Sequence, residues 1–180
     1  MPVTAQLNTT PDGFCRHDAV VADDEFMHFA ADLIDAHDRV VLGRTTYDLF
    51  VAHWPAAARD SSLSEAEQRL GRAIDQTPRT IVSHGMIGSD WQGTEILDAL
   101  NADSAAELAE RGKALILGSP SIIAQFADWG LLDELRLTVH PVMGEHGVRP
   151  FERGQPQGLI AAGEHRLASG VTDFRFIRDG

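Results

Sequence analysis

Cysteine and lysine are almost absent from the sequence, and each shortage excludes a class of protein. Cys15 is the single cysteine, so an internal disulfide and a cysteine-rich metal centre are both excluded. Lys113 is the single lysine, and 27 acidic residues against 15 basic ones give a formal net charge of −12. Because such an acidic chain repels polyanions, we expect neither nucleic acid nor an anionic membrane surface as a partner.

Long apolar runs are missing as well. No stretch approaches the ~18–20 residues that cross a bilayer. Residues 1–13 have neither the basic region nor the apolar core of a secretory signal. We therefore expect a cytoplasmic protein. The 180 residues, 43% of them hydrophobic and 23% charged, suit one compact domain over 1–180.

The order of apolar stretches and turn residues predicts an α/β fold. Strands are expected at 3–10, 39–43, 79–83, 113–118 and 134–143, with a short one at 91–97. Helices are expected at 23–37, 45–54, 63–75, 104–112 and 120–130, the second of them stopped by Pro55. Residues 159–179 predict two antiparallel strands. The alternation of strand and helix favours a mostly parallel sheet covered on both faces.

Three of the expected strands run into glycine, hydroxyl or cationic residues. The turns are GRTT (43–46), SHG (83–85) and GSPS (118–121). Ligands of open α/β sheets bind beyond the carboxyl ends of strands, and the free amides of a helix start bind anions. Each turn alone is more often an ordinary strand-to-helix junction. Together they predict a phosphate site in which Arg44 forks onto the anion and Gly118 permits close approach.

The usual nucleotide-binding motifs do not occur, because the chain has neither G-x-G-x-x-G nor G-x-x-x-x-G-K-[ST]. A cofactor would therefore need a different α/β scaffold. Four segments resemble the dihydrofolate reductase-like family, and in particular the RibD C-terminal-like group that contains the reductase domain of bacterial riboflavin biosynthesis. They are NTTPDGF (8–14), VVLGRTTYDLF (40–50), LILGSPSIIAQFADWGLLDELRLTVHPVMGEHGVRPF (115–151) and SGVTDFRFI (169–177).

The resemblance implies a three-layer fold and a cofactor, NADPH. The expected centre is a mixed, mostly parallel sheet of about eight strands, with antiparallel C-terminal strands and flanking helices. When the roles of the family's residues are carried over by position, the adenosine-side phosphates of the cofactor would bind at Gly43, Arg44, Thr45 and Thr46. Ser83 would lie near the 2′-phosphate. The pyrophosphate would be cradled by the turn of Gly118, Ser119, Pro120, Ser121 and Ile122.

Two positions depart from the family pattern. Gly118-Ser119 stands where dihydrofolate reductases have Gly-Gly, which leaves the geometry of that peptide bond open. Phe14 stands where relatives in the riboflavin pathway often carry a basic residue after Asp-Gly. This difference counts against a phosphorylated aminopyrimidine substrate. The sequence also lacks the zinc signature of the deaminase that accompanies the reductase in that pathway.

An acidic side chain is the expected proton source for a hydride transfer. The resemblance puts one acid in the first long helix, where Asp24 and Glu25 are candidates, and Asp12 in the PDG turn is a third. Each alone is more often structural, because acids stabilise helix starts and aspartate favours turns. His140 either faces the pocket or is satisfied within the sheet or at a dimer contact.

No metal site is expected. Asp24, His28 and Asp32 share a helix face but lack a fourth ligand, which favours a solvated face. The sequence thus predicts an NADPH-dependent reductase of a small heterocyclic (pterin-like or pyrimidine-like) or carbonyl acceptor, bound between the first helix and the Asp12 turn. A homodimer is expected through residues 130–143. Two alternatives stay open: a non-catalytic nucleotide- or ligand-binding protein on this fold, and a flavin-dependent oxidoreductase.

Overall fold

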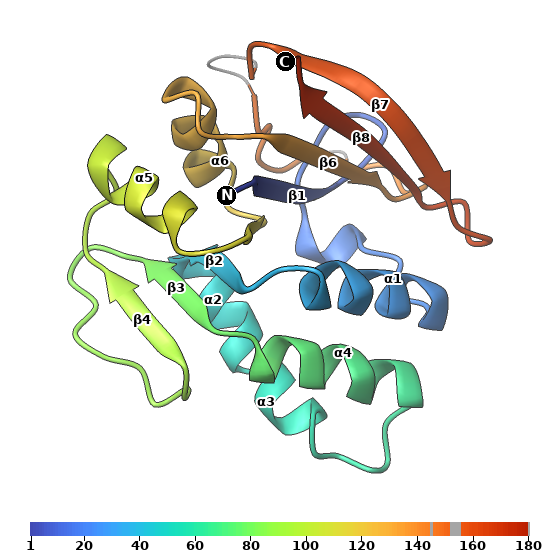
Figure 1. Cartoon of the computed structure of the whole chain (residues 1–180). Helices are drawn as coiled ribbons and strands as arrows, with labels where there is room; N and C mark the ends of the chain where they lie inside the picture. The colour runs from blue at the N-terminus through green and yellow to red at the C-terminus, as the bar shows by residue number, and fades with distance from the viewer. Residues whose placement is uncertain (145, 152–155, 180) are drawn as a thin grey trace.

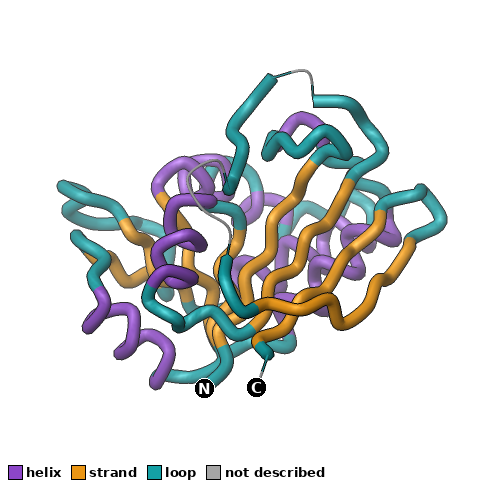
Figure 2. Tube along the Cα trace, turned by 90° about the horizontal axis from the view of Figure 1, so that it is seen from above, coloured by secondary structure: helices purple, strands orange, loops and turns teal. Residues whose placement is uncertain are grey.

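The centre of the protein is an eight-stranded sheet with the strand order β4-β3-β2-β5-β1-β6-β8-β7 (Figure 1). The structure, a computed structural model, describes residues 1–144, 146–151 and 156–179. Figure 2 shows the strands lying side by side between two sets of helices. The strands are β1 (Val3–Thr9), β2 (Arg39–Gly43), β3 (Arg79–Val82), β4 (Thr94–Leu97), β5 (Ala114–Leu117), β6 (Glu134–Val139), β7 (Leu159–Arg166) and β8 (Thr172–Arg178).

The first six strands are parallel, and the last two are antiparallel to their neighbours. The short turn between β7 and β8 can join only antiparallel strands, whereas the earlier strands are separated by long crossover connections. The predicted α/β class, with a mixed sheet and antiparallel C-terminal strands, is confirmed. β6 pairs with β1 on one side and β8 on the other, so strand pairing between copies through β6 is excluded. The homodimer itself stays a prediction.

Helices cover both faces of the sheet (Figure 1). The α1 face, as we call it, packs against α1, α2 and α4, and the opposite α6 face packs against α5 and α6. In the described residues, no helix is both long and apolar enough to span a lipid bilayer. The helices are η1 (a 3-10 turn, His17–Ala19), α1 (Asp24–Asp35), α2 (Arg44–Val51), α3 (Trp54–Ala57), α4 (Glu65–Gln76), α5 (Ala102–Glu110) and α6 (Pro120–Asp128).

Coverage on both faces explains which residues the strands carry. All four residues of β5 are buried, as expected of a central parallel strand. In β1, Ala5 and Leu7 belong to the apolar cluster of the α6 face. Side chains alternate along a strand, so Gln6 and Asn8 lie on the α1 face, where covering helices exclude most of the water. These two polar residues must therefore find partners within the protein.

Two predicted elements end three residues or more before the position expected from the sequence. The helix expected at 45–54 ends at Val51, and Pro55 lies in the first turn of α3 instead of stopping α2. Proline is well tolerated there, because the first amides of a helix have no intrahelical partner. The strand expected at 134–143 ends at Val139, shortly before Pro141, which has no N–H to donate.

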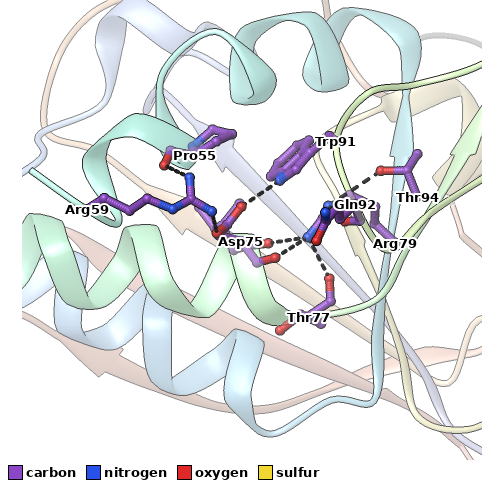
Figure 3. Close-up of polar contacts among 9 residues, drawn as sticks. Pro55, Arg59, Asp75, Thr77, Arg79, Trp91, Gln92 and Thr94 are labelled. Carbon is purple, nitrogen blue, oxygen red and sulfur yellow. Dashed lines mark hydrogen bonds and ion pairs between the residues drawn. The ribbon is translucent and has the colours of Figure 1, made fainter.

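A buried arginine anchors the end of α4 (Figure 3). Arg79 is 2% exposed. Its guanidinium donates to the carbonyl oxygens of Ile74, Asp75, Thr77 and Gln92 at 2.6–3.0 Å. It also lies 3.8 Å from the centre of the Trp91 ring. A cation at a helix C-terminus offsets the helix dipole, and the planar fork of arginine matches several carbonyls at once.

Replacing this arginine tests how much the fold depends on it. We expect Arg79→Lys to lower the free energy of unfolding by about 2–3 kcal/mol, because lysine loses the stacking and leaves buried carbonyls without donors. Urea unfolding measures the change. Arg111→Lys, at an exposed ion pair with Glu95, is the matched control and should change stability by less than about 0.5 kcal/mol. Equal effects in the two variants would contradict the role given to Arg79.

Candidate functional site

Two strand-to-helix junctions meet at the carboxyl edge of the sheet. β2 leads through Gly43 into α2, and the neighbouring β5 leads through Gly118 and Ser119 into α6. The backbone N–H of Gly43 donates to Ser119 Oγ at 2.7 Å. A Cβ on Gly43 would lie 2.8 Å from that oxygen, so only glycine fits without a shift of Ser119. The turns GRTT and GSPS are therefore in direct contact, joined by this hydrogen bond.

The turn after β5 has an unusual backbone. Gly118 and Ser119 have φ values of 60° and 57°, and Ser119 is the only described residue other than glycine with a positive φ. For serine this left-handed conformation costs on the order of 1 kcal/mol. Two contacts hold it: Gly118 N donates to Gln6 O at 2.9 Å, and Thr46 Oγ1 lies 3.2 Å from Ser119 Oγ. The expected Gly118–Ser119 turn is thus fixed to β1 and to the first turn of α2.

The two helices at this junction start without side-chain caps. Among the helices of eight residues or more, α1, α4 and α5 are capped by Asp23, Ser64 and Asn101. α2 and α6 have no side-chain cap. Ser119 occupies the N-cap position of α6, but its hydroxyl bonds to Gly43 instead. In α6, Pro120 has no N–H and the Ile122 N–H already donates to Ser119 O at 2.9 Å. The candidate donors for an anion are therefore the first amides of α2 and the N–H of Ser121, and the helix dipoles add positive potential there.

The predicted cofactor residues are only partly brought together. Gly43, Thr46, Gly118 and Ser119 form the junction described above. Ser83 follows β3, the strand next to β2, and is 8% exposed. Thr45 and Ser121 are exposed on the first turns of α2 and α6, Pro120 begins α6, and Ile122 is buried in the core.

Arg44 is exposed at the start of α2 and is already paired. Its Nε donates to both carboxylate oxygens of Asp48 at 2.8 and 2.9 Å, one helical turn along. The side chain is 55% exposed. A phosphate would therefore share the guanidinium with Asp48, which weakens the attraction.

The three predicted catalytic acids each have a different structural partner. Asp12 accepts from the backbone N–H of Gly144 at 2.9 and 3.2 Å and so ties the PDG turn to the segment after β6. Asp24 accepts from Ser64 Oγ at 3.4 Å. Glu25 accepts from Ala168 N at 2.8 Å, in the turn between β7 and β8. Their role in proton transfer stays a prediction, and the geometry gathers none of them at the Gly43–Ser119 junction.

The face of α1 that carries Asp24, His28 and Asp32 packs along α4. His28 lies 3.4 Å from Glu65, and Asp32 accepts from Arg69 at 2.6 Å. Across residues 1–144, 146–151 and 156–179, no three histidine, cysteine, aspartate or glutamate side chains are grouped for a metal ion.

A buried polar network on the α1 face escaped the sequence analysis. It joins Gln6, Asn8, Thr138, His140 and Asp173 across β1, β6 and β8. His140 is 1% exposed and satisfied within the sheet, the second of the two roles expected for it. The alternation of Gln6 and Asn8 with Ala5 and Leu7 was the available signal. The alternation marks Gln6 and Asn8 as one face of β1, but it does not show that their partners lie on β6 and β8.

A cavity of about 430 Å³ opens at the same edge, on the α6 face. It lies between the carboxyl ends of β1 and β6 and the segment at 149–151. This differs from the position predicted for the acceptor, between the first helix and the Asp12 turn. Its walls are mostly apolar, with a guanidinium at one side that also stacks on Phe14. They are formed by Thr9, Thr10, Gly13, Leu137, Val139, Arg149, Pro150 and Phe151.

Comparison with known proteins identifies the family. The model of the RibD C-terminal domain matches residues 3–172, nearly the whole chain. The chain belongs to the RibD C-terminal domain family. The predicted resemblance and its dihydrofolate reductase-like fold are confirmed. In sequence, the chain is 27% identical over 151 residues to the uncharacterized protein YyaP of Bacillus subtilis (strain 168), covering 83% of this chain and 78% of that protein.

Solved structures share the fold at low sequence identity. A riboflavin biosynthesis protein from Shewanella sp. PV-4 superimposes with a TM-score of 0.70 at 18% identity, over 100% of both chains. A pyrimidine reductase-like protein from Corynebacterium diphtheriae gives 0.59 at 16% identity, over 99% of this chain and 92% of that one. A Thermotoga maritima diaminohydroxyphosphoribosylaminopyrimidine deaminase/5-amino-6-(5-phosphoribosylamino)uracil reductase gives 0.65 at 12% identity, over 99% of this chain and 56% of the other.

Substitutions at Ser119 separate its two effects on the junction. We expect Ser119→Ala to lower the free energy of unfolding by about 1–2 kcal/mol, because it removes the acceptor of the Gly43 N–H and keeps the left-handed backbone. Ser119→Gly loses the same acceptor but relieves the strain, so it should be about 0.5–1 kcal/mol more stable than Ser119→Ala. Thermal and urea unfolding give both values. A glycine variant no more stable than the alanine variant would contradict this account.

His140 makes stability depend on pH. Burial lowers the pKa of His140 from 6.5 to about 4. Between these values the unfolded chain binds a proton that the folded chain does not, so the free energy of unfolding should fall as pH drops, by up to about 3 kcal/mol in total. Burial also lowers the pKa of His37, which adds a change of the same sign.

Urea unfolding between pH 6.5 and 5 measures this slope before most carboxylates titrate. The slope should be smaller in His140→Gln than in the wild type. His37→Gln serves as the matched comparison, because that histidine is less buried. An unchanged slope in His140→Gln would show that His140 is not buried in its neutral form.

Proposed function

We propose that the protein is an NADPH-dependent reductase that transfers hydride to a small heterocyclic acceptor, of pyrimidine or pterin type, or to a carbonyl acceptor. The observation that carries this proposal is the junction of β2 and β5, where two uncapped helix starts adjoin the Gly43–Ser119 contact. Membership of the RibD C-terminal domain family supports it, because solved relatives include pyrimidine reductases.

The residues at the junction fit the phosphates of a dinucleotide. Gly43 and Gly118 let the two turns pack closely on Ser119 and Thr46. The first amides of α2 and the N–H of Ser121 offer donors. Thr45 and Ser121 add hydroxyls on the same two first turns. Arg44 and Ser83 would lie toward the adenosine end. NADPH bound here would supply the hydride, while the protein binds and orients the nucleotide and the acceptor.

One observation favours a second function, a nucleotide-binding protein without turnover. Asp12, Asp24 and Glu25 each hold a structural hydrogen bond, and none lies at the junction. A reductase needs a proton source as well as a hydride. The binding proposal and the catalytic proposal therefore require separate measurements.

Calorimetric titration with NADPH and with NADH tests the binding site. We expect NADPH to bind more tightly than NADH. Arg44→Ala should weaken NADPH by roughly tenfold and NADH by less, because a charge-assisted contact to phosphate contributes about 1.5 kcal/mol. Arg59→Ala removes an exposed arginine that pairs with Asp75, away from the junction, and is the matched control. Equal weakening by both substitutions, or no binding of either nucleotide, would refute the site.

Oxidation of NADPH, followed by its absorbance in the presence of pyrimidinedione, pterin and carbonyl acceptors, tests the reaction. Turnover with any of them supports a reductase. Tight NADPH binding without turnover on the whole panel supports the non-catalytic alternative.

A further inference from the structure

Asn8 lies in β1, just beyond the last residue pair that β1 forms with β5. The last residue pair between β1 and β5 is Gln6 with Leu117, and β5 then turns off through Gly118 and Ser119 into α6. β1 continues along β6, with Asn8 opposite Thr138, and leads on to α1 on the other face of the sheet. In open α/β sheets, ligands bind beyond the carboxyl ends of the strands at such a switch point. Asn8 lies near the carboxyl end of β1, on the α1 face.

The direction of each hydrogen bond in the buried network is fixed, starting from Asp173. Arg136 donates to Asp173 Oδ2 from Nε at 2.9 Å and from Nη2 at 2.6 Å. The Asp173 carboxylate accepts, so the Thr138 hydroxyl donates its proton to Asp173 Oδ1 at 2.9 Å. Thr138 Oγ1 must then accept from Gln6, which places the amide nitrogen of Gln6, and not its oxygen, at 2.9 Å from Thr138.

The same logic continues to Asn8. The second hydrogen of the Gln6 amide points to Asn8 Oδ1 at 2.8 Å. His140 Nδ1 accepts from the backbone N–H of Val21 at 3.0 Å, so the proton of the neutral ring is on Nε2. That Nε2 lies 3.1 Å from Asn8 Oδ1 and donates to it. The Asn8 oxygen thus accepts two hydrogen bonds, which fixes the plane of the amide and turns its nitrogen away from the network.

The network leaves one donor group uncommitted. Gln6, Thr138, His140 and Asp173 are 7%, 0%, 1% and 2% exposed, whereas Asn8 is partly exposed. Among the described residues, none accepts a hydrogen bond from Asn8 Nδ2. A buried, fully satisfied network keeps its members rigid. Here it holds a donor amide near the carboxyl end of β1, where the chain paths after β1 and β5 separate.

We propose that the Asn8 amide nitrogen is a ligand-positioning donor for the carbonyl oxygen of a carboxamide or ring lactam bound at this edge. The inference deepens the proposed function and rests on it for the identity of the site. Two ligands of a reductase carry this chemistry: the carboxamide of the nicotinamide ring and the ring carbonyl of an oxopyrimidine or pterin acceptor. Asn8 recognises the shared group, and the experiment separates its two sources.

Nuclear magnetic resonance can observe this amide directly, because Asn8 and Asn101 are the two asparagines of the chain. The full-length protein labelled with 15N only in asparagine is titrated with nicotinamide, with uracil and with pyridine, which lacks the carbonyl. We expect the Asn8 side-chain NH2 signals to shift saturably with nicotinamide, uracil or both, and Asn101 to stay unchanged. A shift with nicotinamide alone assigns Asn8 to the cofactor, and one with uracil alone assigns it to the acceptor.

The variant Asn8→Asp tests the donor without dismantling the network. It keeps an oxygen for Gln6 and His140 and replaces the donor nitrogen by an acceptor. The dissociation constant of the probe that shifts Asn8 should rise roughly fivefold to tenfold, as expected for one lost hydrogen bond. Asn101→Asp adds the same charge at the N-cap of α5, where aspartate is equally suitable, and should change nothing. Asn8→Ala serves as a second variant if Asn8→Asp does not fold.

The outcomes separate this proposal from the proposed function. Asn8 signals that do not move with nicotinamide or uracil, or that move equally with pyridine, overturn the role of Asn8 even if NADPH binds. Asn8 signals that move with uracil in a protein that binds neither NADPH nor NADH overturn the reductase and leave Asn8 as a carbonyl-binding residue.

Discussion

The contact between Gly43 N–H and Ser119 Oγ is the constraint around which the functional edge is arranged. β2 and β5 are parallel neighbours, but their chains continue on opposite faces of the sheet, so they must separate where they end. The serine hydroxyl bridges the separating backbones at 2.7 Å. It can do so only because Gly43 has no Cβ and because Ser119 accepts a left-handed backbone. Because this hydroxyl bonds to Gly43, it does not cap α6, so the packing of β2 beside β5 also determines how α6 begins.

Burial explains the polar interior. Gln6, Thr138 and Asp173 are buried on the face of the sheet that carries α1, so they must satisfy one another. Leaving one such buried group unpaired would cost several kcal/mol. Removing any one member of the network therefore destabilises the fold through the partner that it leaves without a hydrogen bond. Arg79 follows the same rule at the other end of the sheet, where backbone carbonyls replace water.

The helices and strands could be predicted from the sequence because the patterns that indicate them span only a few adjacent residues. The buried β5, the capped α4 and the Gly118–Ser119 turn each show in a few adjacent residues, and the resemblance supplied their order. The missed features depend on distant residues. The sequence predicts Pro55 as a helix stop, because nothing in the neighbouring residues indicates that a new helix begins beside it. The partners of Asp12 and Glu25, Gly144 and Ala168, lie more than a hundred positions away, and Asn8 joins the network through His140.

The strongly negative charge of the chain and a phosphate site are compatible because the donors at the junction are chiefly backbone amides. Amides keep their partial charge at any pH, and helix dipoles act within the first turn of α2 and α6. Charges farther than about 8–10 Å away are largely screened at physiological salt. An anion at this edge therefore responds to the local N–H groups and to Arg44, with Asp48 as the one carboxylate paired to that arginine. The proposed phosphate site therefore relies on backbone N–H groups and on Arg44, and not on the net charge of the chain.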